Sequence, residues 1–197
     1  MNIILVHGIF DNGKLFKYMV RFLKAAGHAC HVPSLKPADA RNGIADLAEK
    51  LAECVNASIG ENEKFVLIGF SMGCLVSRYY LQELNGVDRC LAFHAISGPH
   101  KGSRLAHFYV GKGAIEMRPG SDFLQKLKAG ESRLAKIPLY AYRTPFDLMI
   151  LPSTSSHWET AQNHVTKAVA HRLMLRDRFV CNHIKQSLIN LASSPAA

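Results

Sequence analysis

Short apolar runs alternate with longer segments whose apolar residues recur three or four positions apart. Runs of the first kind are typical of strands buried in a parallel sheet, and the second spacing is typical of amphipathic helices. We therefore expect six strands, over residues 2–6, 28–32, 65–68, 89–96, 137–142 and 165–169. The main helices are expected between them and after them, over residues 14–26, 40–59, 72–85 and 174–191.

This alternation predicts an α/β fold: a minimal, mostly parallel sheet of about six strands with right-handed crossovers and helices on both faces. The 197 residues fit a single domain. Residues 99–135 are the only stretch long enough for an insertion, and we expect them to form a small cap or a pocket rim. Glycines in and beside this stretch would suit a mobile segment: Gly98, Gly102, Gly111, Gly113 and Gly120.

Composition and charge narrow the function classes. The formal net charge of +9 could suggest a nucleic-acid partner, but the basic residues are scattered along helical segments, without a dense run interleaved with aromatics. We expect a solvated basic surface, no nucleic-acid partner and at most peripheral membrane contact. The five cysteines are widely spaced and include no Cys-x-x-Cys pair, which favours reduced thiols over a disulfide framework or a zinc site.

The first apolar run does not resemble a signal peptide. It begins at Asn2, lasts five residues and leads into a loop with candidate chemistry. No run approaches the ~20 apolar residues of a membrane span. We therefore expect a cytoplasmic protein, unless a longer precursor exists.

The strongest chemical signal is the serine at the centre of Gly69-Phe70-Ser71-Met72-Gly73. An apolar run precedes this pentapeptide and an amphipathic segment follows it, so the pattern is strand, sharp turn, helix. This is the Gly-x-Ser-x-Gly arrangement that exposes a nucleophilic serine at a strained turn. The alternative is a serine in an ordinary tight turn between strand and helix.

A second glycine-containing loop, His7-Gly8-Ile9-Phe10, follows the first strand. Carboxyl ends of parallel strands share one edge of a sheet, so this loop can bring a backbone N–H near Ser71. Together with the N–H of Met72, it would form an oxyanion hole. Ile9 is the expected second donor, with Phe10 as the alternative; His7 would otherwise only pack locally.

The same reasoning predicts an acid and a base after the last two strands. Asp147 follows the expected strand 137–142, and His171 follows the expected strand 165–169. The order Ser71, Asp147, His171 is one of those found in Ser-His-Asp triads. The competing candidates lie away from expected strand ends: His157, His164 and His183 for the base, and Glu116, Asp122 and Glu159 for the acid.

With these residues, the chain resembles a small, nearly lidless α/β-hydrolase of the bacterial triacylglycerol lipase/esterase kind, similar in plan to Bacillus lipase A. The resemblance rests on Val6–Ile9, on Gly69–Gly73 and on Val169–Leu175, and it covers most of the chain. The segment Ser97–Ser103 resembles one found in related hydrolases, where Pro99 to Ser103 would form part of the pocket rim. Gly69 and Arg172 depart from the pattern, which has Ala and a small or apolar residue there.

The resemblance implies a serine hydrolase of carboxylic esters that needs no cofactor and no metal. Its substrate would be a small-molecule or lipid ester with a short- to medium-chain acyl group, contacted by Phe10, Pro99 and His100. The same triad would serve a thioesterase or a lipid deacylase. A non-catalytic binding protein with this fold is the alternative from another class.

Overall fold

The computed structural model describes residues 1–193, and a parallel sheet of six strands forms its centre. The strand order is β2-β1-β3-β4-β5-β6, and every neighbouring pair is parallel. This confirms the α/β class with about six strands. The strands are β1 (Asn2–Val6), β2 (Ala29–His31), β3 (Phe65–Phe70), β4 (Cys90–Ile96), β5 (Leu139–Arg143) and β6 (Gln162–Val165).

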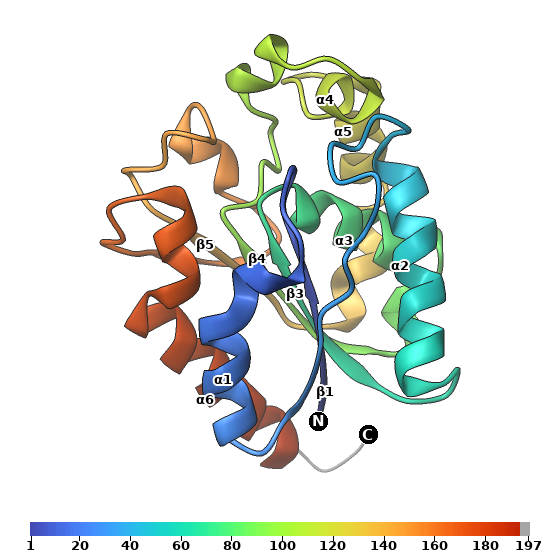
Figure 1. Cartoon of the computed structure of the whole chain (residues 1–197), viewed down its shortest axis with the longest axis vertical. Helices are drawn as coiled ribbons and strands as arrows, with labels where there is room; N and C mark the ends of the chain where they lie inside the picture. Colours follow the sequence, from blue (N-terminus) through green and yellow to red (C-terminus); the bar gives the residue numbers. More distant parts are fainter. Residues whose placement is uncertain (194–197) are drawn as a thin grey trace.

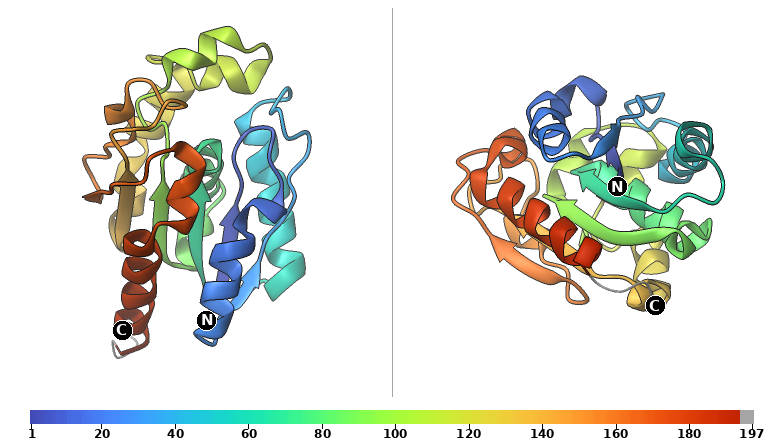
Figure 2. Two further views of the ribbon diagram at one scale, coloured as in Figure 1. Left: turned by 60° about the vertical axis from the view of Figure 1, so that its left-hand side comes forward. Right: turned by 90° about the horizontal axis from the view of Figure 1, so that it is seen from below.

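Helices cover both faces of the sheet (Figures 1 and 2). On one face lie α1 (Lys17–Ala25) and α6 (Arg178–Ser193); on the other lie α2 (Ile44–Ile59) and α3 (Met72–Glu83). Successive residues of β1 enter different cores: Ile3 packs on the α1/α6 side and Ile4 on the α2/α3 side. A strand buried on both faces must be apolar throughout, which explains the uninterrupted run in the sequence.

The chain changes direction across the sheet between β1 and β3. From β1 it crosses outward to β2, and it then returns to build β3 and all later strands on the other side of β1. The loops that follow β1 and β3 therefore diverge at the carboxyl edge, where ligands bind in open α/β sheets. Ser71 directly follows β3 at this position.

Two helices begin later than the sequence pattern predicts. A 3₁₀ turn over Gly13–Phe16 precedes α1, and the side chain of Asn12 caps this turn by accepting from the N–H of Lys14. The second helix begins at Ile44 rather than at residue 40, because Gly43 with φ of 105° directs the preceding chain away from the helix axis. Apolar spacing alone does not reveal either break.

The prediction of a last strand over 165–169 is wrong, because β6 spans Gln162–Val165. This edge strand pairs only with β5, and two of its four residues, Asn163 and His164, are polar and half-buried. The last helix also begins later than expected, at Arg178, after a 3₁₀ turn over His171–Arg176. Buried Met174 and Leu175 in that turn imitate a helical spacing.

Residues 99–135, which we call the cap segment, hold α4 (Lys112–Glu116), α5 (Asp122–Ala129) and two 3₁₀ turns. It reaches the N-terminus of α2, where the Ile44 N–H donates to Glu116 Oε2 at 2.6 Å (Figure 1). Burial raises the pKa of Glu116 against the opposing effects of this hydrogen bond and of nearby Lys112. Within residues 1–193, no helix combines the length and apolarity needed to cross a membrane.

Candidate active site

Ser71 occupies a strained backbone position between β3 and α3. Its φ of 55° and ψ of −127° lie in a region that residues with a side chain rarely adopt. Two hydrogen bonds hold this turn: the Ser71 N–H donates to the Ile96 carbonyl, and the Cys74 N–H donates to the Ser71 carbonyl, both at 2.9 Å. Strain of this kind persists only where the surrounding structure fixes it.

Three glycines make the turn sterically possible. A Cβ on Gly73 would lie 2.2 Å from the Val6 carbonyl oxygen, and one on Gly69 would lie 2.8 Å from the Cα of Cys74. A Cβ on Gly8 would lie 3.0 Å from the Cβ of Ser71. The start of α3 thus lies directly against the end of β1.

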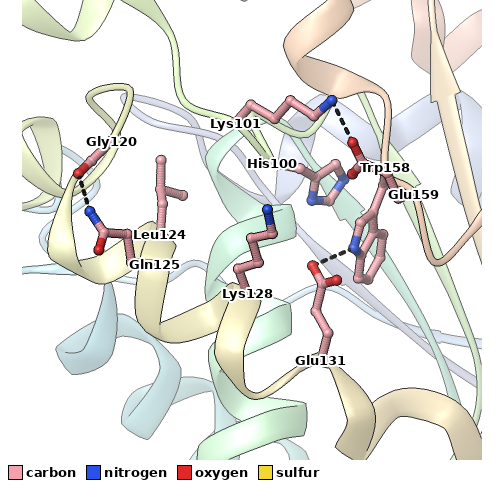
Figure 3. A pocket seen from close by; sticks show the side chains of 9 residues that line it. All are labelled: His100, Lys101, Gly120, Leu124, Gln125, Lys128, Glu131, Trp158 and Glu159. Carbon is pink, nitrogen blue, oxygen red and sulfur yellow. Dashed lines mark hydrogen bonds and ion pairs between the residues drawn. The ribbon is translucent and has the colours of Figure 1, made fainter.

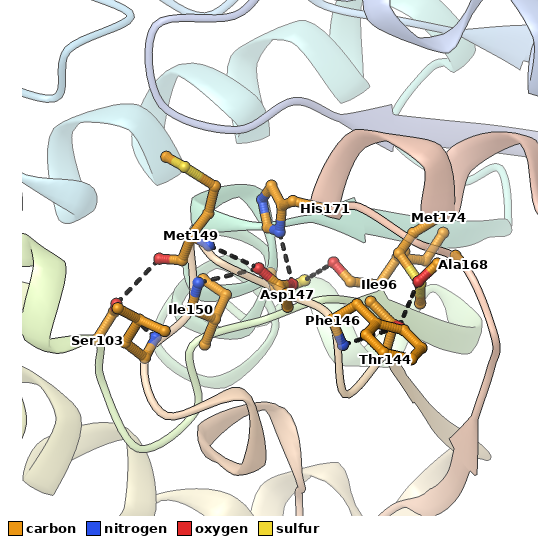
Figure 4. Close-up of polar contacts among 12 residues, drawn as sticks. Ile96, Ser103, Thr144, Phe146, Asp147, Met149, Ile150, Ala168, His171 and Met174 are labelled. Atoms are coloured by element: carbon orange, nitrogen blue, oxygen red, sulfur yellow. Dashed lines mark hydrogen bonds and ion pairs between the residues drawn. The ribbon is translucent and has the colours of Figure 1, made fainter.

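His171 and Asp147 are joined by a hydrogen bond of 2.7 Å between Nδ1 and Oδ2 (Figure 4). Asp147 is almost fully buried, and its other oxygen, Oδ1, accepts the N–H groups of Met149 at 2.9 Å and Ile150 at 3.0 Å. Burial alone would raise the pKa of Asp147. The hydrogen bonds and the attraction to His171 outweigh burial, so that the pKa lies below its ordinary value.

This pairing fixes the chemistry of the imidazole ring. With Nδ1–H donating to a carboxylate, the neutral ring has its acceptor lone pair at Nε2. The ring lies against Phe70, the residue before Ser71, with ring centroids 4.7 Å apart. No hydrogen bond joins Ser71 Oγ and His171 in the described chain, an arrangement common in catalytic sites without substrate.

Two backbone N–H groups near Ser71 are available as donors. Met72 is the first residue of α3, and N–H groups in the first turn of a helix have no partner within it. Ile9 lines the same cavity as Ser71. Its loop is tied down by buried His7, whose Nε2 accepts the Leu35 N–H at 2.9 Å and whose Nδ1 lies 2.8 Å from the Gly8 carbonyl oxygen.

The cavity beside Ser71 is narrow and almost wholly apolar, with a volume of about 40 Å³. It is lined from the loop after β1, from the cap segment and from the loop after β5: Ile9, Ser71, Pro99, Ser103, Leu105, Ala106, Tyr109, Met117, Met149 and Ile150. Phe10 does not line this cavity, but its ring packs at a tilt against Tyr109 of the cavity wall, with ring centroids 5.6 Å apart.

His100 lies away from this cavity. It lines a separate one of about 440 Å³ together with Lys128 and Trp158 (Figure 3). The His100 ring stacks on Trp158 at 4.5 Å between centroids, and its Nδ1 lies 3.4 Å from Arg78 Nη1. Pro99 thus lines the cavity beside Ser71, whereas the next residue, His100, lines the separate cavity with Trp158.

The other candidate acids and bases also lie elsewhere. His164 and His183 pack against each other between β6 and α6, with ring centroids 4.1 Å apart. Glu116 caps α2, and exposed Glu159 pairs with Lys101 at 2.6 Å. The two remaining candidates, His157 and Asp122, are absent from the lining of the serine cavity.

Supporting residues are harder to predict from sequence. Ser103 Oγ donates to the Met149 carbonyl and accepts the Leu151 N–H, both at 3.0 Å, and so fixes the loop that holds Asp147. Exposed Arg172 pairs with Asp11 and links the His171 turn to the loop after β1. Ser103 gave a sequence signal only as the last residue of the Ser97–Ser103 segment, which resembles one in related hydrolases.

Across residues 1–193, no group of three or more His, Cys, Asp or Glu side chains is placed to hold a metal ion. The cysteines of the described chain are all free thiols.

Comparison with solved structures shows the same fold in several hydrolases. The mature lipase BlEst2 of Bacillus licheniformis superposes with a TM-score of 0.77 at 16% identity, covering 95% of this chain and 91% of that one. A monoacylglycerol lipase of Paleococcus ferrophilus gives 0.71 at 12% identity, covering 98% and 95%. Lipase B of Aspergillus fumigatus gives 0.70 at 18% identity, covering 88% of this chain and 49% of that one.

At these identities the likeness concerns the fold. Among curated proteins, none matches the chain in sequence. A family model described as the alpha/beta hydrolase fold matches residues 2–112, which include the loop after β1 and the whole serine turn. The chain therefore belongs to the α/β-hydrolase fold family.

Proposed function

We propose that this protein is a serine hydrolase that cleaves carboxylic esters through an acyl-enzyme at Ser71. The observation that carries the proposal is the buried Asp147–His171 hydrogen bond of 2.7 Å beside a strained serine at the carboxyl edge of the sheet. The lipases and esterases among the structural neighbours support the same reaction class.

Each residue has a defined role in the proposed reaction. Ser71 Oγ attacks the acyl carbonyl while His171 Nε2 accepts its proton and then delivers it to the departing alkoxide. Asp147 holds the imidazole in the required tautomer and stabilises the imidazolium that forms. The N–H groups of Ile9 and Met72 would stabilise the oxyanion, and water then releases the acid by the same steps.

The cavity favours a small acyl group. Its volume of about 40 Å³ and apolar walls suit a short hydrocarbon chain, so we expect acetyl to butyryl esters to react faster than long-chain esters. The finer likeness to lipase A-type enzymes rests on the short oxyanion loop and on the serine turn. A thioesterase or lipid deacylase would use the same groups, and a substrate panel separates these activities.

The deciding experiment is hydrolysis of p-nitrophenyl esters from acetate to palmitate by wild type and by Ser71→Ala. Loss of the nucleophile should reduce kcat/KM by at least about 10³-fold. Ser77→Ala is the matched control, because its hydroxyl is buried in the same helix and has no described hydrogen-bond partner. This variant should keep wild-type activity and should still react with a fluorophosphonate probe.

Full activity of Ser71→Ala would disprove the assignment of the nucleophile. If wild type neither hydrolyses any ester or thioester nor labels with the probe, a ligand-binding role on the same fold replaces the proposal.

A further inference from the structure

Exposed apolar side chains gather at one end of the molecule. Nine of the thirteen large apolar side chains exposed among the described residues lie in the cap segment or in loops and 3₁₀ turns that follow the carboxyl ends of strands. We call these nine residues the apolar rim: Phe10, Phe108, Val110, Ile115, Phe146, Leu148, Met149, Val169 and Leu173. A concentration of this kind marks a surface that contacts another apolar phase or a partner.

The apolar rim adjoins the serine cavity. Met149 belongs to both, and the Phe10 ring packs at a tilt against Tyr109 of the cavity wall. Because all six strands are parallel, the loops after β1, β4, β5 and β6 lie at the same end of the sheet, as Figure 1 shows. The most exposed members, Phe108 at 83% and Val110 at 93%, flank Tyr109 in the cap segment.

Uncompensated positive charge lies among these apolar residues. Lys36, Arg104 and Lys167 are exposed side chains of the connections that follow β2, β4 and β6, and they form no ion pair with a residue between 1 and 193.

Four acidic groups beside the apolar rim are engaged, whereas exposed Asp122 in the cap segment forms no ion pair within residues 1–193. Asp11 pairs with Arg172, and Asp39 pairs with Arg41. Asp147 is buried against His171, and Glu116 accepts the N–H of Ile44. The formal net charge of +9 for the chain has the same sign as this surface.

We propose that the apolar rim docks on a bilayer that contains anionic phospholipid, with the serine cavity facing the lipid. The exposed apolar side chains enter the headgroup region, and the neighbouring cations bind lipid phosphates. The proposal of docking depends only on the exposed residues described above. We also infer that the bilayer supplies the ester substrate, and this part rests on the proposed hydrolase function.

Charge favours the lipid surface over a second copy of the chain. In a two-fold dimer, the same patch faces itself, so Lys36, Arg104 and Lys167 would oppose the same three cations. Like charges that face each other across an interface oppose association. An anionic bilayer instead offers apolar contact and charge complementarity together.

The test uses Ser71→Ala, so that binding is measured without hydrolysis. Flotation is performed with vesicles of phosphatidylcholine alone and with vesicles that also contain phosphatidylserine. We expect retention on the mixed vesicles, weaker retention on neutral ones, and release from the mixed vesicles as salt rises. Adding Phe108→Ser and Val110→Ser should weaken partitioning by at least about tenfold, since each change removes an apolar side chain from the interface.

The matched control replaces exposed apolar residues on the helices, Tyr18→Ser in α1 and Ile189→Ser in α6. This pair should bind vesicles like its parent. Arg104→Gln with Lys167→Gln should weaken binding to mixed vesicles and leave binding to neutral vesicles unchanged. Phe108 and Val110 are almost fully exposed, so their variants should keep the parent's melting temperature.

Three results would overturn the proposal: no retention on mixed vesicles, equal binding by the rim and control variants, or a dimer in light scattering that the rim variant dissociates. Failure of the proposed function is separate from these. If the protein binds vesicles but cleaves no soluble ester, the docking proposal stands and the hydrolase assignment is wrong. If it cleaves soluble esters but does not bind vesicles, the hydrolase assignment stands and the docking proposal is wrong.

Discussion

Asp147 uses its two carboxylate oxygens for different tasks. Oδ1 closes a turn by accepting two backbone N–H groups, and Oδ2 orients His171. The same side chain is thus both a turn residue after Pro145 and the hydrogen-bond partner of His171. The consequence is that the local fold of the loop and the orientation of the imidazole depend on one side chain.

The substitution Asp147→Asn should separate these tasks. The amide oxygen of the new side chain can still accept the N–H groups of Met149 and Ile150, but the amide cannot stabilise an imidazolium and favours the wrong tautomer. We expect a fall of about 10³–10⁴-fold in kcat/KM with the fold retained. Steady-state kinetics and circular dichroism of the variant test this, and loss of less than about tenfold would contradict the role assigned to Asp147.

At the scale of single residues, the sequence pattern singles out candidate reactive groups more readily than the residues that hydrogen-bond around them. Ser71, Asp147 and His171 could be selected because each was expected just beyond a strand. The argument for His171 used a strand that in fact ends at Val165, so the residue lies within a 3₁₀ turn six positions later. Ser103 acts through contacts with residues 46 and 48 positions away, which no local pattern encodes.

At the scale of elements, the junction between β3 and α3 depends on glycine. Gly73 faces backbone atoms of Val6 and His7, and Gly69 faces backbone atoms of Cys74. Backbone cannot move aside as a flexible side chain can, so an added methyl group must displace the helix or the strand.

Alanine at these positions should destabilise the protein in the order of the predicted clashes. We expect Gly73→Ala to lower the free energy of unfolding by more than about 3 kcal/mol, and Gly69→Ala by about 1–3 kcal/mol. Gly27→Ala is the control, because its added Cβ would meet no atom within 4 Å and only its φ of 86° opposes the change. That strain should cost about 1–2 kcal/mol.

Urea unfolding of the three variants measures these differences. Equal losses at Gly73 and Gly27 would show that steric contact does not control the junction.

The sequence predicts the boundaries of a strand accurately where its run of apolar residues is unbroken. β1 was predicted correctly, because burial on both faces leaves no ambiguity. The edge strand β6 was displaced by several residues, because half-buried Asn163 and His164 occupy positions that the hydrophobic pattern cannot recognise. The Asn163 side chain accepts a hydrogen bond from the Trp158 N–H and donates one to the Trp158 carbonyl, which accounts for an asparagine at this position.

At the scale of the whole molecule, buried histidine makes folding sensitive to acid. His94 on β4 lies 2.9 Å from the Tyr142 hydroxyl on β5 and 3.1 Å from the Ser187 hydroxyl on α6. The same Tyr142 hydroxyl contacts His183, whose ring packs on His164 of β6. Burial, with a smaller effect from the charges of His183 and His164, lowers the pKa of His94 to about 3.

The free energy of unfolding should therefore decrease as pH falls from 6.5 towards 3. The unfolded chain binds a proton at His94 below the ordinary pKa of 6.5, whereas the folded chain resists it until about 3, so acid favours unfolding over this range. His94→Gln should show a shallower decrease, measured by urea unfolding at successive pH values. His107→Gln, at an exposed position of the cap segment, should keep the wild-type slope; an unchanged slope in His94→Gln would contradict the assignment.

The fold class was predictable because strand and helix patterns alternate along most of the chain, which admits few topologies. The packing of the cap segment was not, because it depends on pairs such as Glu116 with Ile44, which are 72 positions apart. The role of the cap segment as a mobile cover, the site roles and the cytoplasmic location stay predictions.

The tethered loop after β1 has a consequence for conformational entropy. His7 binds the backbone of Leu35, and the Phe10 N–H donates to the Ala38 carbonyl at 2.8 Å, so this loop is held on both sides of Ile9. Its backbone freedom is lost once, when the chain folds, and is not lost again each time a substrate arrives. A chain that loosened this tether would have to order the same loop in every turnover, and its rate would fall even with all three side chains of the proposed triad intact.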